Sequence, residues 1–233
     1  TRLIKLETLW SAIPYIKLWS LTGRDIPLPP LSTQSLIVAK LDKAFANIDR
    51  QIWLLKMNIE DAENMKKSVL EESFQGGEYV AKKLWEIARF IDYRWKTPVK
   101  TDSGIPLITA KNIRSWYIDE NPREYIAESD YLSWMTRWFP NRWDLAFTTE
   151  APLWNIAEID LDYKIALAQR VIVFQAKENS YIPWFLKYHI LSPSFQKTLF
   201  EKGTGTTVKW IKASVLKEIT IPIPPLPRQH EIV

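Results

Sequence analysis

The sequence predicts a mixed α/β or α+β globular domain joined to a long α-helix that forms a coiled coil. Three observations support this prediction: a proline-rich phrase that occurs twice, a heptad pattern after its first copy, and strand-like and helix-like segments between the copies. The phrase reads IPLPPLSTQSLIV at 26–38 and IPIPPLPRQHEIV at 221–233. A fixed period indicates a structural unit used twice. Because the chain begins without Met and stops just inside the second copy, we expect it to be part of a longer protein.

The first copy of the phrase leads into a predicted helix over 32–74. Ser32 is a suitable N-cap, neither Pro nor Gly follows until Phe74, and Gly76-Gly77 ends the segment. Within this segment, apolar residues recur at alternating spacings of four and three, as at positions a and d of a coiled coil. The predicted interface consists of Phe45, Ile48, Ile52, Leu55, Ile59 and Ala62, and Lys66 interrupts it. Such a helix would be about 64 Å long, and one apolar stripe of that length requires a partner helix.

The second copy of the phrase predicts this partner. Pro227 takes the place of Ser32 and suits the first turn of a helix, so a second long helix should begin at 227. We expect the intact protein to pair its two helices. We expect this chain to borrow a helix from another chain instead, which would give a homodimer through the long helix.

The segment between the two helices has the pattern of one α/β or α+β domain over 78–226, after a tail at 1–31 and the helical region at 32–77. Residues 227–233 begin the second helix. Runs rich in Ile, Val, Leu and Phe predict strands at 105–110, 145–149, 156–159 and 165–174. The remaining apolar segments predict helices at 181–191 and 193–202 and a short helix or turn at 213–219.

The composition makes an enzyme the least supported function. The chain has no cysteine, which excludes disulfides and thiolate metal sites and is compatible with the cytoplasm, where we expect the protein. Its two histidines are His189, which we expect to be structural, and His230, and no nucleotide-binding, metalloprotease or serine-hydrolase motif is present. The net charge of +4 is a mild bias towards polyanions.

Loop-like stretches of the domain carry Arg, Lys, Asn and Thr, which suits binding to nucleic acid. Arg and Lys neutralise phosphates, and Arg, Asn and Gln can make paired hydrogen bonds to base edges. The same residue types also decorate the surfaces of many soluble proteins. The residues alone therefore leave two hypotheses open, a DNA reader and a coiled-coil adaptor whose α/β head binds protein without DNA specificity.

A further motif precedes the second copy of the phrase, with Gly-Thr-Thr, Lys and Ile spaced over 205–211. This motif, the phrase IP(L/I)PPLxxQ and the period of 195 residues together resemble the specificity subunit of type I restriction–modification enzymes, over essentially the whole chain. The resemblance implies two target-recognition domains, each followed by a conserved helix, with the two helices antiparallel. Residues 1–31 would be the C-terminal tail of the first recognition domain and residues 78–226 a complete second one. Each domain would read one half of a split target in double-stranded DNA.

The same resemblance implies a subunit that is not catalytic and has no cofactor of its own. It would dock methyltransferase subunits, which use S-adenosylmethionine, and through them motor-nuclease subunits. Matching the recognition-domain motifs residue by residue places seven residues near DNA: Lys96, Thr97, Lys111, Asn112, Arg114, Arg142 and Thr149.

Tryptophan stands where the resembling motifs have glycine. The chain has 12 Trp and only 6 Gly in 233 residues, although glycine usually makes up about 7% of a protein. We expect glycine at Trp10, Trp19, Trp85, Trp95, Trp116, Trp138, Trp143, Trp154 and Trp210. Glycine serves where φ is positive or where backbones approach closely, so a genuine Trp at these positions should weaken folding or binding.

Overall fold

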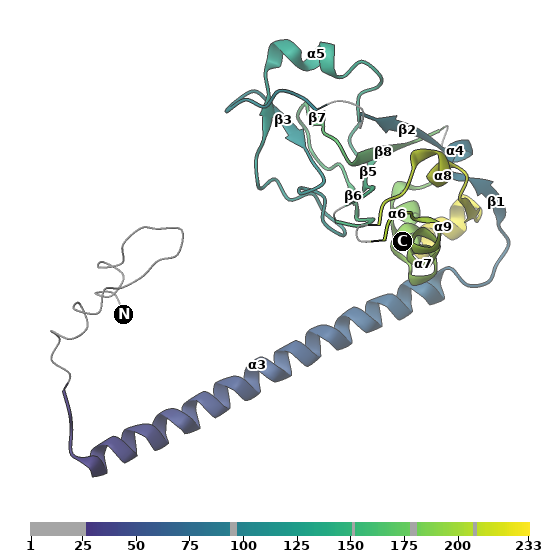
Figure 1. The fold of residues 1–233 in the computed structure, drawn as a ribbon. Helices are drawn as coiled ribbons and strands as arrows, with labels where there is room; N and C mark the ends of the chain where they lie inside the picture. Colours follow the sequence, from purple (N-terminus) through teal and green to yellow (C-terminus); the bar gives the residue numbers. More distant parts are fainter. Residues whose placement is uncertain (1–26, 94–96, 151, 178–180, 207–208) are drawn as a thin grey trace. The chain divides into compact units, whose positions relative to one another are not determined.

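A computed structural model describes residues 27–93, 97–150, 152–177, 181–206 and 209–233 (Figure 1). The chain divides into two compact units, Thr1–Glu60 and Asp61–Val233. Helix α3 (Leu31–Ser73) has 43 residues and buries none of them. The predicted long helix is therefore confirmed, while its pairing in a coiled coil stays a prediction.

Both copies of the proline phrase form the same helix start. Helix α3 begins at Leu31 and helix α9 (Leu226–Ile232) begins at Leu226, its counterpart in the repeat. In the first copy the Gln34 Nε2 donates to the Pro29 carbonyl at 2.7 Å, and in the second the Gln229 Nε2 donates to the Pro224 carbonyl at 2.9 Å. This glutamine folds back onto the phrase, which accounts for its place in the motif. Because α3 begins at Leu31, Ser32 lies inside its first turn and is not the N-cap.

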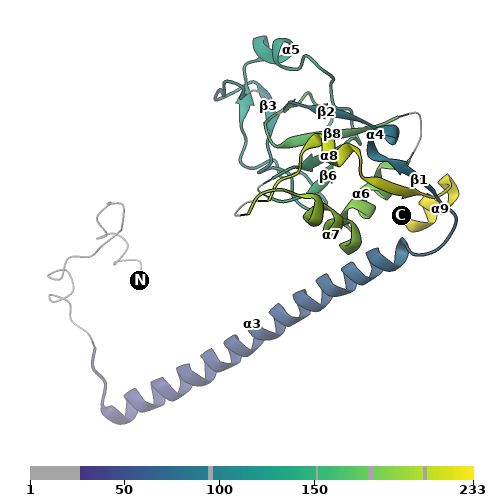
Figure 2. The ribbon, with the colours of Figure 1, turned by 45° about the vertical axis from the view of Figure 1, so that its right-hand side comes forward.

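The described strands of the second unit form three sheets, and Figures 1 and 2 show most of its helices together beside the strands, with α5 (Tyr131–Trp134) apart at the top. The largest sheet has the order β2-β8-β5-β6, a second has the order β4-β3-β7, and β1 pairs with β9. The strands are β1 (Val80–Lys83), β2 (Ala88–Asp92), β3 (Ile105–Ile108), β4 (Tyr125–Ile126), β5 (Leu145–Thr148), β6 (Ile156–Glu158), β7 (Ala166–Leu167), β8 (Val171–Ala176) and β9 (Thr220–Ile223).

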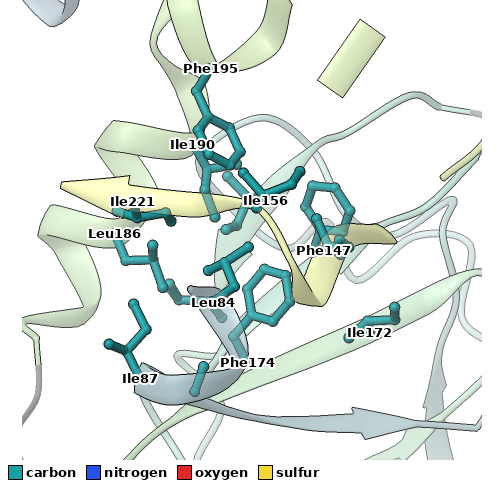
Figure 3. Packing of buried hydrophobic residues seen from close by; sticks show 14 of the residues in the cluster. Leu84, Ile87, Phe147, Ile156, Ile172, Phe174, Leu186, Ile190, Phe195 and Ile221 are labelled. Carbon is teal, nitrogen blue, oxygen red and sulfur yellow. The ribbon is translucent and has the colours of Figure 1, made fainter. Parts of the chain in front are cut away.

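The four-stranded sheet separates two hydrophobic cores because successive side chains of a strand point to opposite faces. Phe147 and Phe174 enter a core with helices α6 (Pro183–Leu191) and α7 (Pro193–Lys202), and Figure 3 shows both rings in the same cluster as Leu186 and Ile190. Ala146 enters the other core, which includes β3 and β7. The central strands are buried on both faces, so they read as continuous apolar runs.

The predicted mixed α/β domain is confirmed, with differences in detail. The prediction of one strand over 165–174 is wrong: β7 and β8 belong to different sheets and are joined by a turn at Arg170, where φ is +69°. The short helix α8 (Ala213–Lys217) ends two residues earlier than expected. The elements not predicted from sequence are β1, β2, β4, β9, helix α4 (Leu84–Ile87), helix α5 (Tyr131–Trp134) and a 3₁₀ turn at Glu128–Asp130.

Three of the tryptophans flagged as glycine positions have left-handed backbones: Trp116 at φ +91°, Trp143 at φ +73° and Trp154 at φ +53°. These are conformations that glycine adopts without steric cost. Trp85 lies in α4, and neither Trp138 nor Trp210 has a positive φ. Trp10, Trp19 and Trp95 lie outside the described residues.

Candidate nucleic-acid interface

Loops that follow β3 and β7 form a polar groove at one edge of the three-stranded sheet. The two strands are parallel and in register at Ile108 and Leu167, so the residues after them leave the sheet side by side. The groove has a volume of about 190 Å³. It is lined by Thr97, Pro98, Lys100, Leu107, Thr109, Ala110, Lys111, Glu124, Ala168, Gln169 and Arg170.

The groove brings together two of the residues predicted near DNA, Thr97 and Lys111. Thr97 Oγ1 accepts a hydrogen bond of 2.6 Å from the Nε2 of Gln169. Lys111 is exposed and makes no ion pair with any described residue, whereas Lys100 pairs with Glu124 at 2.7 Å. Lys111 is therefore a cation that a phosphate could neutralise without breaking a bond inside the protein.

Asn112 lies beside the groove but has a structural role in this chain. Its side chain is 2% exposed. Its Oδ1 accepts from the N and Oγ1 of Thr109, at 3.0 and 2.8 Å, and its Nδ2 donates to the carbonyls of Asp119 and Pro122, at 2.9 and 3.0 Å. These bonds occupy the amide and fix the loop that carries Lys111, so Asn112 shapes the groove from inside.

Thr149 is also buried, at 3% exposed. Its N and Oγ1 both donate to the Arg170 carbonyl, at 3.0 and 3.3 Å. Thr149 thus holds the β7–β8 turn that forms one wall of the groove. The prediction that Asn112 and Thr149 lie near DNA is untested, and their side chains are directed into the protein.

Arg142 does not line the groove. It precedes β5, whereas Thr149 follows β5, so the two residues lie at opposite ends of that strand. The Arg142 Nη2 and Nε contact Asp160 Oδ1 at 2.6 and 2.8 Å.

Arg114 lies in a turn beyond Asn112 and pairs with Asp119 at 3.3 Å. A hydrogen bond from the Asn121 backbone N–H lowers the pKa of Asp119. Desolvation opposes this effect and Arg114 adds to it, so the net pKa is lowered and the carboxylate form of Asp119 is favoured. Lys96 lies outside the described residues.

The motif matches did not select Lys100, Gln169 and Arg170, which line the groove. Gln169 and Arg170 fall inside the run read as one strand over 165–174. The signal was present, because this polar pair interrupts an otherwise apolar segment, ALAQRVIVF, at the point where the chain turns. Lys100 lies in one of the loop-like stretches that carry Arg, Lys and Thr, but no motif match distinguishes it from the other charged residues there.

An apolar groove of about 420 Å³ lies at the end of α3 within the second unit. Met65 and Val69 of α3, Phe74, Trp116 and Ile232 are among the residues that line it. Lys66, which interrupts the heptad pattern, places its Nζ 3.4 Å from the centre of the Trp116 ring. Burial lowers the pKa of Lys66.

The described part of the chain has neither a metal-binding cluster nor a membrane-spanning helix. Its residues include no group of three or more His, Cys, Asp or Glu side chains that could hold a metal ion. None of the described helices has the length and apolar character needed to cross a membrane.

Comparison with known proteins gives one consistent result. Residues 77–233 match the family model described as type I restriction modification DNA specificity domain. The chain is 25% identical to the type I restriction enzyme MjaVIII specificity subunit of Methanocaldococcus jannaschii, over 97% of the chain and 57% of that protein. It is 23% identical to the EcoBI specificity subunit of Escherichia coli, over 89% of the chain and 50% of that protein. The chain thus spans about half the length of these relatives.

Solved structures share the fold. A structure described as the structural basis of complex assembly and conformational transition of the type I R-M system matches with a TM-score of 0.67 and 21% identity, over 95% of this chain and 55% of that one. The HsdS subunit of Thermoanaerobacter tengcongensis matches with a TM-score of 0.51 and 19% identity, over 100% of this chain and 58% of that one.

Proposed function

Because this chain belongs to the family of type I restriction modification DNA specificity domains, we propose that it reads one half of a bipartite target in double-stranded DNA. The observation that carries the proposal is the groove at the ends of β3 and β7, where polar side chains from three separate loops converge. Lys111 lies among them and forms no ion pair with any described residue, whereas Lys100 pairs with Glu124. The subunit would recognise DNA and leave the chemistry to its partners. The family itself was predicted from the repeated phrase, and that prediction is confirmed.

The groove has the two kinds of group that a DNA reader needs. Lys111 offers a positive charge for the phosphate backbone, and Gln169 with Thr97 offers hydrogen-bonding groups for base edges. These groups lie on turns held by backbone hydrogen bonds, such as the 2.9 Å bond from Ala168 N to the Ile108 carbonyl. A rigid support favours recognition, since little ordering is required on binding.

The test is a binding measurement on the full chain together with a methyltransferase subunit, using duplexes with a randomised half-site. We expect enrichment of one short sequence and an affinity that falls steeply with salt. Equal binding to all duplexes would contradict the proposal and would favour the protein-binding adaptor instead.

We also propose that α3 pairs antiparallel with a second copy of this chain. Its heptad residues are strongly exposed, with Phe45 at 55% and Ile59 at 60%. The second copy is the occupant favoured by the repeat, because the same phrase and the same glutamine contact begin both α3 and α9. The apolar groove that combines the end of α3 with Ile232 offers a surface continuous with such a pair.

The paired helices would act as a spacer between two recognition domains. Half-sites about one turn of duplex apart, roughly 34 Å, need a stiff separation of their readers, and α3 at roughly 1.5 Å per residue is about 64 Å long. Methyltransferase subunits, which would supply the S-adenosylmethionine, and motor-nuclease subunits would assemble around this frame. Light scattering of the purified chain tests the pairing: a dimer is expected, and a strict monomer at micromolar concentration would contradict it.

A further inference from the structure

We propose that Gln169 is a specificity-determining residue that reads an adenine in the major groove of the half-site. This inference rests on the proposed function and adds to it the residue and the base. Its starting point is the β7–β8 turn, which lies inside a segment that the sequence presents as one strand. The turn places Gln169 in the wall of the polar groove and Arg170 immediately after it.

The turn is fixed on both sides of Gln169. On one side Ala168 N donates to the Ile108 carbonyl at 2.9 Å. On the other side the Arg170 carbonyl accepts two hydrogen bonds from Thr149, and the Arg170 Nε lies 2.7 Å from Glu150 Oε1. The backbone of Gln169 therefore cannot move without breaking contacts to strand β3 and to the loop after β5.

Arg170 supports the same conclusion through its backbone. Its φ of +69° lies in the left-handed region, which costs a non-glycine residue about 1–2 kcal/mol. Strain of this kind persists where surrounding contacts impose it and is frequent at functional sites. In this turn the strained residue fixes the direction in which its neighbour Gln169 leaves the sheet.

The hydrogen bonds of Gln169 leave a pattern that matches adenine. Its Nε2 uses one N–H on Thr97 Oγ1 at 2.6 Å. The second N–H and the Oε1 have no hydrogen-bond partner among the described residues. One donor and one acceptor on a planar amide are the complement of adenine N7 and N6 in the major groove.

No other lining residue of the groove in the described chain combines these properties. The Thr109 hydroxyl is used, since it donates to Asn112 and accepts from Lys111 N. The guanidinium of Arg170 is engaged by Glu150, and Lys100 is engaged by Glu124. Lys111 carries charge but no acceptor. Gln169 is the one side-chain amide in the lining, so it is the group suited to select a base, with Lys111 suited to a phosphate.

The experiment compares variants of the full chain with its methyltransferase subunit in selection from a randomised half-site duplex. For the unmodified protein we expect adenine at one position. Gln169→Ala should reduce that preference about tenfold or more while leaving the other positions unchanged. Gln169→Glu, which can accept but not donate, should move the preference at this position from adenine towards cytosine.

Three further variants separate the possible roles. Thr97→Val should weaken the preference at the same position, and Thr97→Ser should restore it, since Thr97 is a positioning residue. Lys111→Ala should lower affinity for all sequences and reduce the salt slope by about one. Gln75→Ala, at an exposed glutamine after α3, is the matched control and should change nothing.

The outcomes distinguish this inference from the function on which it rests. If the unmodified protein shows no sequence preference, the proposed function fails. If it shows a preference that Gln169→Ala and Gln169→Glu both leave unchanged at every position, the chain is a DNA reader and the role of Gln169 is overturned. Thermal melting of each variant shows whether the fold is retained, and the Thr97→Val and Thr97→Ser pair tests the same position independently.

Discussion

Helix α3 and the domain that follows it use apolar residues in opposite ways. In α3, Ile52 is 44% exposed and Leu55 is 60% exposed, and no residue of the helix is buried. In the domain, Phe147 and Phe174 are fully buried. The domain thus satisfies its hydrophobic groups internally, whereas the apolar stripe of α3 stays exposed to solvent in this chain. Stability and assembly are therefore separable properties that different substitutions should affect.

The largest effect should come from the core of the domain. Phe147→Ala removes a ring that packs 5.5 Å from the ring of Phe174, and truncation of a buried Phe costs about 3–5 kcal/mol. Chemical denaturation should show this loss in the free energy of unfolding. The exposed Phe139 provides the control, and Phe139→Ala should cost far less. Equal costs would mean that the sheet core does not stabilise the domain.

A smaller effect is expected for assembly through α3. Ile52→Asp puts a charge in the middle of the heptad stripe and should weaken the dimer roughly a hundredfold, about 2.7 kcal/mol. Sedimentation at several concentrations measures this change, and the melting of the domain should stay the same. Met57→Asp places the same charge at the f position of the heptad pattern, outside the stripe, and should leave the dimer intact. A dimer unaffected by Ile52→Asp would place the interface elsewhere.

The domain core should also respond to pH through His189. Its ring lies among Phe74, Phe185 and Phe195, with centroids 4.9 to 6.2 Å apart, and burial lowers its pKa to about 4. Because this value lies below the ordinary 6.5 of an unfolded chain, the unfolded state takes up the proton first as the pH falls. The stability contributed by neutral His189 is thus complete above about pH 6.5 and is lost towards pH 4.

This loss should not exceed about 1.4 kcal/mol per pH unit. Other groups titrate in the same range, so the informative quantity is the difference between the unmodified chain and His189→Phe, which keeps an aromatic ring in the cluster. Unfolding measured from pH 7 to pH 4 should show a shallower pH dependence for His189→Phe. Identical curves for the two proteins would contradict a buried neutral His189.

The smallest effect concerns a strained position in the domain. Trp143 has a φ of +73° and is 40% exposed. Trp143→Gly relieves the left-handed strain, whereas Trp143→Ala removes the ring but keeps a Cβ. The glycine variant should be about 1 kcal/mol more stable than the alanine variant. Denaturation of the two variants measures the difference, and an alanine variant of equal stability would show that the backbone is unstrained there.

The helices were more predictable from the sequence than the groove. The heptad spacing from Phe45 to Ala62 and the long interval without Pro or Gly predicted α3, and Pro193 with Lys202 bounded α7 as expected. These signals are local. Strand β9 was missed because Pro222 disfavours a strand, yet it is tolerated in a two-stranded sheet where it faces Ala81 of β1.

The groove was harder to predict because its residues are distant in sequence. Thr97, Lys111 and Gln169 meet only because β3 and β7 are parallel neighbours, a pairing that no local pattern reveals. The family motifs indicate Thr97 and Lys111, which line the groove, but they also indicate Asn112 and Thr149, which are buried. Residue type alone does not tell a side chain that faces a ligand from one that supports the loop beneath it.

The matching contacts of Gln34 and Gln229 have a consequence for how such a chain can change. Each contact closes the proline phrase on itself, so the start of the following helix is set within the phrase. A segment bounded by two such matching joints could be exchanged as a cassette, by recombination within the repeated phrases, without redesign of the helix that follows. New recognition could then be acquired in a single genetic event instead of by gradual substitution.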